Sequence, residues 1–257
     1  MEETQKNPIQ VSEKLFQVIE VLAEHGPMGI MELSAALGFH KSTTHRLVTS
    51  LQCLGYIRQD SDSLKYALSL KFLQIGSKII NQTNVASLIH PILRRISDVV
   101  GETVHLVRRE GNDVVYIDKV ESGAGSIRMA SRVGNRLPLY CSGVGKALLA
   151  EMEDEEIKKI WNTSNVRQLT PKTIVSFDQL EERIAQVRAE GCALDDEENE
   201  EGVRCIAVSL QDYHRVPVYA LSISGPVHRM TDERMLELKD QILMYKNEIE
   251  KLLGGGK

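Results

Sequence analysis

An α+β architecture in two domains is expected for this chain of 257 residues. Three amphipathic helical patterns and two β-rich segments occupy the first 70 residues, whereas the remainder alternates β-rich runs with longer helical patterns. Apolar residues make up 42% of the chain, which is enough for two packed cores. We therefore expect one domain over residues 1–70, a helical linker over 71–86 and a second domain over 87–257.

The composition indicates a cytoplasmic protein. The longest apolar runs fall short of 18 residues, and the polar, acidic first ten residues do not resemble a signal peptide. The four cysteines are widely spaced, without a CxxC pair or a histidine cluster. We therefore expect free buried thiols, no metal site, no cofactor and no membrane partner.

Apolar spacings of three, four and seven residues predict three helices in the first domain. They cover Ser12–His25, Ile30–Leu37 and Lys41–Leu54, and Gly38 stands where a left-handed residue ends the second helix. A helix, a tight turn and a second helix form the helix-turn-helix pattern. The second helix of this motif enters the major groove of DNA.

A wing is predicted after the third helix, where segments 56–59 and 64–68 flank a polar turn. The net charge of −5 does not indicate nucleic acid, but the window from Leu33 to Gln59 contains no acidic residue. A three-helix protein-interaction module is the alternative for this pattern. We predict DNA contacts from polar and basic side chains of the third helix and the wing: Lys41, Ser42, Thr43, His45, Arg46, Arg58 and Lys65.

The rest of the chain reads as mostly antiparallel strands flanked by helices. Two helices, Leu70–Asn81 and Val85–Val100, are expected to join the domains and to hold a homodimer. A β-hairpin follows over 103–120. The remaining elements are expected as helices over Gly143–Met152, Glu155–Trp161, 177–190 and Thr231–Leu253, and as strands over Val203–Leu210 and Val216–Ser224.

Polar groups at unusual places predict a ligand site in the second domain. The helix beginning at Gly143 and Val144 has free N–H groups that suit an anion. Ser222 and Ser224 share one face of an apolar strand, and a buried hydroxyl without a partner costs about 1–3 kcal/mol. A ligand carboxylate can supply acceptors, and Asp195 can accept hydrogen bonds from ligand hydroxyls. The alternatives for the serines are solvent exposure and bonding to nearby backbone.

Enzymatic chemistry finds little support in the sequence. The stretch Gly143–Lys146 lacks the spacing of a phosphate-binding loop, and GxSxG and HExxH motifs are missing. Cys205 reads as a small core residue, and its alternative role as a nucleophile has no visible base. The acidic run Asp195–Glu201 lacks EF-hand spacing and is expected to be a solvated loop. We predict that the protein is not an enzyme.

Four motifs carry a family resemblance: KSTTHRL at 41–47, LPLYCSGVGKA at 137–147, EEGVRCIAV at 200–208 and ALSISGP at 220–226. Together they resemble the isocitrate-lyase-regulator (IclR) family of bacterial transcription factors. The likeness extends over nearly the whole chain. It implies a winged helix-turn-helix joined to a GAF-like effector domain, homodimers or dimers of dimers, and regulation of a catabolic operon, by repression rather than activation.

The resemblance also implies an effector site. Family contacts carry over onto Leu137, Gly143, Val144, Asp195, Cys205, Ser222 and Ser224. Segments 64–71 and 127–134 are most similar to ketodeoxygluconate regulators, which implies 2-keto-3-deoxygluconate or a related sugar acid as the small carboxylate effector. The alternative function is a GAF-type sensor that acts through protein partners.

Overall fold

The computed structural model of the chain describes residues 7–75, 84–121 and 131–255. It divides into two compact units, residues 1–83 and 84–257, and this division falls inside the span expected as a linker. Residues 71–75 are helical, but the rest of the helix expected over Leu70–Asn81 lies outside the described residues. Within the described ranges, no helix is both long and apolar enough to cross a membrane.

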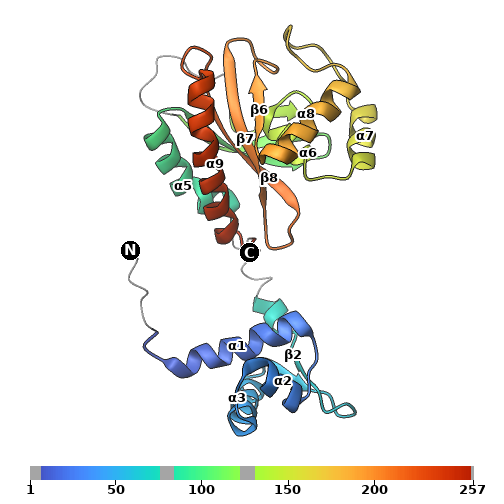
Figure 1. Cartoon of the computed structure of the whole chain (residues 1–257), viewed down its shortest axis with the longest axis vertical. Coiled ribbons are helices and arrows are strands. Elements are labelled where there is room, and N and C mark those ends of the chain that lie inside the picture. The colour runs from blue at the N-terminus through green and yellow to red at the C-terminus, as the bar shows by residue number, and fades with distance from the viewer. Residues whose placement is uncertain (1–6, 76–83, 122–130, 256–257) are drawn as a thin grey trace. The chain divides into compact units, whose positions relative to one another are not determined.

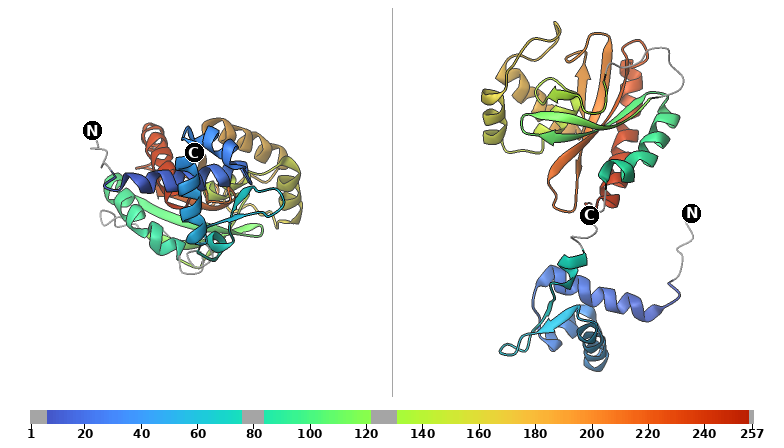
Figure 2. Two further views of the ribbon diagram at one scale, coloured as in Figure 1. Left: turned by 90° about the horizontal axis from the view of Figure 1, so that it is seen from below. Right: turned by 180° about the vertical axis from the view of Figure 1, so that it is seen from behind.

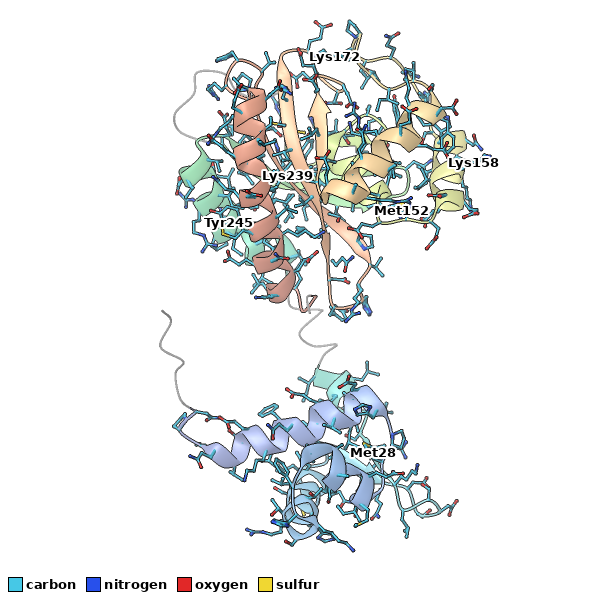
Figure 3. The ribbon with its side chains drawn as sticks, viewed as in Figure 1. Met28, Met152, Lys158, Lys172, Lys239 and Tyr245 are labelled. Atoms are coloured by element: carbon cyan, nitrogen blue, oxygen red, sulfur yellow. The ribbon has the colours of Figure 1, made fainter. Side chains whose placement is uncertain are left out.

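The N-terminal unit is a three-helix fold with a small hairpin (Figure 1). Its elements are α1 (Gln10–His25), α2 (Ile30–Leu37), α3 (Lys41–Cys53), β1 (Ile57–Gln59) and β2 (Tyr66–Leu68). The strands pair antiparallel, and Met28, labelled in Figure 3, adds a backbone bridge to Tyr66. Glu32 accepts a hydrogen bond from the Gly29 N–H at 2.7 Å, and Gly38 ends α2 with φ of 66°. The expected winged helix-turn-helix is therefore confirmed.

The core of this unit comes from one stripe on each helix and from the base of the hairpin. Its fully buried members are Val18, Leu22, Leu33, Leu47, Val48, Leu51, Ile57 and Tyr66. The stripe on α3 leaves the opposite side of that helix to solvent.

A six-stranded antiparallel sheet forms the centre of the C-terminal unit, in the order β5-β4-β3-β8-β7-β6. Its strands are β3 (Thr103–Glu110), β4 (Asp113–Val120), β5 (Arg136–Pro138), β6 (Ala193–Asp196), β7 (Val203–Gln211) and β8 (Pro217–Pro226). The edge strands β5 and β6, which have only three and four residues, were not predicted from the sequence. Such short strands carry little periodicity.

Helices cover both faces of this sheet (Figures 1 and 2). One face packs against α5 (Val85–Val100) and α9 (Asp232–Leu252), where the ring of Tyr245, labelled in Figure 3, lies 5.8 Å from the Arg95 guanidinium. The other face packs against α6 (Gly143–Leu149), α7 (Asp154–Thr163) and α8 (Phe177–Glu190). The expected α+β architecture is confirmed.

Strand alternation decides which side chains reach the α6 face. Leu221 and Ile223 of β8 join the core beneath α5 and α9, so Ser222 and Ser224 point to the opposite side. His105 of β3 lies opposite Ser222 in the strand register, and Cys205 of β7 lies opposite Ser224. The sheet thereby gathers polar side chains from three strands on one face.

Candidate functional site

The exposed side of α3 carries the predicted DNA contacts. Lys41, Ser42, His45 and Arg46 are exposed, and Thr43 is half-buried. The buried stripe of this helix consists of apolar residues and Thr44, so the predicted contact residues do not form part of the core. The structure therefore brings five of the predicted contacts together on the first two turns of one helix.

The wing supplies the two remaining predicted contacts. Arg58 is exposed on β1, whereas Lys65 is half-exposed and its Nζ lies 3.9 Å from Glu32 Oε2. The turn between the strands is ordered by Asp60, whose carboxylate accepts hydrogen bonds from the Ser63 N–H and hydroxyl, each at 2.8 Å. These hydrogen bonds hold the pKa of Asp60 below its usual value. Because the tip is acidic, phosphate contacts of the wing must come from its flanks.

A second site is a polar pocket in the C-terminal unit, between the α6 face of the sheet and the start of α6. All seven predicted effector residues line it: Leu137, Gly143, Val144, Asp195, Cys205, Ser222 and Ser224. Ser142 and Val203 also line the pocket, and so do five residues that the sequence did not indicate as effector contacts: His105, Tyr116, Ser131, Asn199 and Glu200. The pocket thus combines residues from all six strands of the sheet and the start of α6 with nearby loops.

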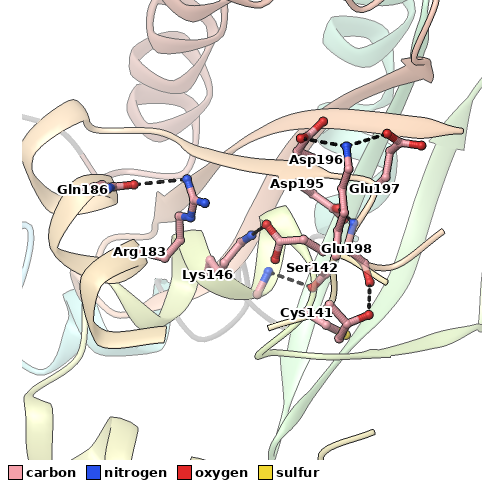
Figure 4. Close-up of polar contacts among 12 residues, drawn as sticks. Cys141, Ser142, Lys146, Arg183, Gln186, Asp195, Asp196, Glu197 and Glu198 are labelled. Carbon is pink, nitrogen blue, oxygen red and sulfur yellow. Dashed lines mark hydrogen bonds and ion pairs between the residues drawn. The ribbon is translucent and has the colours of Figure 1, made fainter. Parts of the chain in front are cut away.

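Because Gly143 has no side chain, the start of α6 can lie close to the sheet. A Cβ at this position would lie 2.9 Å from the Cys205 sulfur, which no ordinary packing tolerates. Ser142 caps the helix by accepting a hydrogen bond from the Gly145 N–H at 3.1 Å, as drawn in Figure 4. The expectation of several free N–H groups at this helix start is therefore only partly correct, because the cap occupies one of them.

The two serines are buried, so the alternative of solvent exposure is wrong. Each hydroxyl oxygen, of Ser222 and of Ser224, lies 3.4 Å from Nδ1 of His105. His105 Nε2 lies 2.8 Å from the Ser131 hydroxyl, and the imidazole ring packs 4.9 Å from the ring of Tyr116. Burial lowers the pKa of His105 to about 3, so the imidazole is neutral at physiological pH. A polar residue within the apolar segment TVHLV was the available signal for His105.

Asp195 lies in the pocket wall and is buried. Its carboxylate accepts a hydrogen bond from the Glu198 N–H at 2.8 Å. Loss of hydration raises the pKa of Asp195 to about 6, against the opposing attraction of Lys146. Beside it, Lys146 and Glu198 form an ion pair that is almost completely inaccessible to solvent (Figure 4).

The expectation that Asp195–Glu201 forms a solvated loop is wrong for two of its members. Strand β6 holds Asp195 opposite Cys205 in the register, inside the unit, and Lys146 compensates the buried charge of Glu198. Glu197, in contrast, bonds the half-exposed Lys172 at 2.7 Å. Among the described residues no acidic, histidine or cysteine cluster has the arrangement of a metal site.

The buried thiols of Cys141 and Cys205 are unsuited to nucleophilic chemistry at neutral pH, whereas Cys53 is exposed, contrary to the expectation of buried thiols. Burial raises the pKa of Cys141 to about 12, and burial also raises that of Cys205 well above its ordinary value. A nucleophilic cysteine requires the opposite shift, toward the thiolate. Cys205 therefore contributes a neutral, protonated wall to the pocket.

Comparisons with known proteins match both units of the chain to the same family. The family model described as the IclR helix-turn-helix domain matches residues 12–61, and the model described as the C-terminal part of the bacterial transcriptional regulator IclR matches residues 77–250. The chain is 35% identical to the transcriptional repressor IclR of Escherichia coli, over 93% of this chain and 88% of that protein. It is 37% identical to the transcriptional regulator KdgR of the same species, over 90% and 89%.

Solved structures agree with the fold. The repressor BlcR of Agobacterium tumefaciens superposes with a TM-score of 0.82 at 24% identity, covering 98% of this chain and 100% of that one. The IclR protein of Thermotoga maritima gives a TM-score of 0.63 at 31% identity, covering 95% and 99%. The relatives described here by sequence are regulators of transcription.

Proposed function

Because the chain belongs to the IclR family of bacterial transcriptional regulators, we propose that it is a cytoplasmic repressor of a catabolic operon, controlled by a small carboxylate effector. The operator is bound by α3 and the flanks of the wing, and the effector binds in the polar pocket. The observation that carries the proposal is the convergence of all seven expected effector residues on that one pocket. A homodimer, or a dimer of dimers, presents two copies of α3 to a two-fold symmetric operator.

The DNA-binding role rests on the exposed face of α3. Arg46 can bridge the O6 and N7 atoms of guanine, and Ser42 can contact bases or phosphates. The sequence of α3 contains no acidic residue, so nothing on this helix repels the phosphate backbone.

The choice of a carboxylate rests on the donors of the pocket. Hydroxyl groups of Ser222 and Ser224 and a helix start at Val144 suit an anion, whereas Asp195 suits a ligand hydroxyl. Burying a carboxylate without such donors would be prohibitive. We propose 2-keto-3-deoxygluconate or a related sugar acid as the effector, a choice supported by the likeness to KdgR of Escherichia coli.

A gel shift tests the proposal. The full-length protein is titrated against a fragment of its own promoter region and against a scrambled fragment, with and without 2-keto-3-deoxygluconate and other 2-keto acids. We expect specific binding that one acid weakens, and the operator must weaken binding of that acid by the same factor. Binding of the acid without any DNA binding would instead identify a sensor that acts through protein partners.

A further inference from the structure

His105 stands at the centre of a chain of hydroxyl groups in the pocket wall. Its Nε2 contacts one hydroxyl, that of Ser131, at 2.8 Å. Its Nδ1 contacts two, those of Ser222 and Ser224, each at 3.4 Å. A neutral imidazole has one N–H donor and one acceptor, so the nitrogen that carries the hydrogen decides which of these hydroxyls donate.

Two tautomers have opposite consequences for the serine pair. When Nδ1 carries the hydrogen, the oxygens of Ser222 and Ser224 accept it, and both hydroxyl hydrogens can point into the pocket. When Nδ1 is the acceptor, it draws a serine hydrogen away from the pocket. Only the first arrangement offers a ligand two hydroxyl donors.

The charge around the ring favours hydrogen on Nδ1. Lys119 Nζ donates a hydrogen bond to the Ser131 carbonyl at 2.7 Å and also pairs with Glu121 Oε1 at 2.7 Å. Its positive charge still lowers the pKa of His105, and because Ser131 also contacts Nε2, this charge lies on the Nε2 side of the ring. A positive charge there attracts the lone pair of Nε2 and repels an N–H. The Ser131 hydroxyl can then donate to Nε2, at an ordinary O–H···N distance.

We propose that His105 is a positioning residue, held as the neutral Nδ1–H tautomer between Ser131 and the serine pair, and that it makes Ser222 and Ser224 a two-donor receptor for a carboxylate group. This inference rests on the proposed function for the identity of the ligand class. It adds a basis for specificity: a carboxylate accepts from both hydroxyls, whereas the NH2 of the corresponding amide would meet a hydroxyl hydrogen.

The tautomer can be measured without a ligand. Full-length protein labelled with 13C,15N-histidine is studied by solid-state NMR, and the His105 signals are assigned as those missing from the His105→Asn variant. We expect a protonated Nδ1 and an unprotonated Nε2. Hydrogen on Nε2, or on both nitrogens, would overturn the proposal. Because this measurement needs no effector, it stands even if the effector proposed above is wrong.

Variants test the consequence for binding. Asparagine places an amide near the position of Nδ1, whereas glutamine reaches toward Nε2, so the two substitutions separate the two ends of the ring. Calorimetry with 2-keto-3-deoxygluconate should give affinities within a few-fold of wild type for His105→Asn and about tenfold or more weaker for His105→Gln. Equal affinities for the two variants, with wild-type binding intact, would contradict the positioning role. Failure of the wild type to bind this acid would contradict only the choice of effector.

Discussion

The two units of this protein present their polar groups in opposite ways. In the N-terminal unit, most of the side chains proposed to contact DNA lie on consecutive turns of one helix, and Lys41, His45 and Arg46 are exposed. In the C-terminal unit the pocket groups come from strands far apart in the sequence and are buried, as with His105 and Ser222, which are 117 residues apart. Exposed groups act mainly on the partner, whereas buried groups also contribute to the stability of the fold. Substitutions in the two units should therefore separate function from stability to different degrees.

The largest expected effect is the loss of folding stability when the buried Lys146–Glu198 ion pair beside the pocket is broken. Lys146→Met leaves the Glu198 carboxylate buried without its cation, and one of its oxygens already lacks a hydrogen-bond partner in the described structure. We expect the free energy of unfolding to fall by about 3–5 kcal/mol, measured by urea denaturation. Lys172→Met is the matched control, because its pairs with Asp196 and Glu197 are half-exposed and should contribute little to the free energy of unfolding. Similar losses in the two variants would mean that burial does not distinguish the pairs.

The second effect is on effector affinity. Replacing Ser222 and Ser224 together by alanine should weaken binding of the acid by roughly 1–3 kcal/mol per lost hydrogen bond, measured by calorimetry. Operator binding by the effector-free variant should persist, because the substitutions lie in the other unit. Wild-type affinity for an acid that controls the promoter would place its binding site elsewhere.

A third effect is confined to DNA binding. Arg46→Ala should weaken operator binding by about 1–3 kcal/mol, the range for a specific base contact, while unfolding and effector binding stay unchanged. Lys158→Ala on α7 removes an equally exposed positive charge from the C-terminal unit and serves as the control (Figure 3). Undiminished operator affinity in a folded Arg46 variant would remove this residue from the interface.

The same contrast explains what the sequence could predict. The bounds of α2 and α5 follow from local spacing and stop signals, and both helices match the expected ranges. The exposed face of α3 is likewise a local pattern, so its residues could be assigned before the fold was known. The seven predicted effector residues, which line one pocket, were reached through the family resemblance together with strand alternation at Ser222 and Ser224.

What the sequence did not predict depends on distant neighbours. Lys146 lies in a seven-residue helix whose side chains are all buried, so it has no polar side that could mark the lysine as exposed or paired. Glu198, its partner, sits in an acidic run whose composition suggests solvent. The role of His105 can be recognised only when β8 pairs with β3 and brings Ser222 and Ser224 to its Nδ1. Contacts between residues distant in the sequence, which composition does not encode, decide the environment of all three residues.

The smallest effect concerns the pH dependence of stability at Asp195. Its pKa in the folded protein is raised to about 6, from an ordinary value of 3.8, chiefly by loss of hydration. The folded state therefore binds this proton more tightly than the unfolded state, so the charged carboxylate costs stability above pH 6, and the cost falls as the pH drops toward 4. The other titratable groups around Asp195 are those of Lys146, Glu198, Glu200 and Cys205. They are the same in the wild type and in a variant changed only at Asp195.

Asp195→Asn removes that cost while its amide oxygen can still accept the Glu198 N–H. The stability of the variant relative to wild type should therefore rise with pH, by about 1 kcal/mol between pH 5 and pH 8, in urea denaturation at each pH. The exposed Asp240, replaced by asparagine, should show no such trend. A difference between variant and wild type that stays flat over this range, or that falls with pH, would mean that Asp195 is not held in a poorly hydrated wall. The contrast between a buried polar pocket and an exposed helix face proposed to bind DNA would then lose one of its main supports.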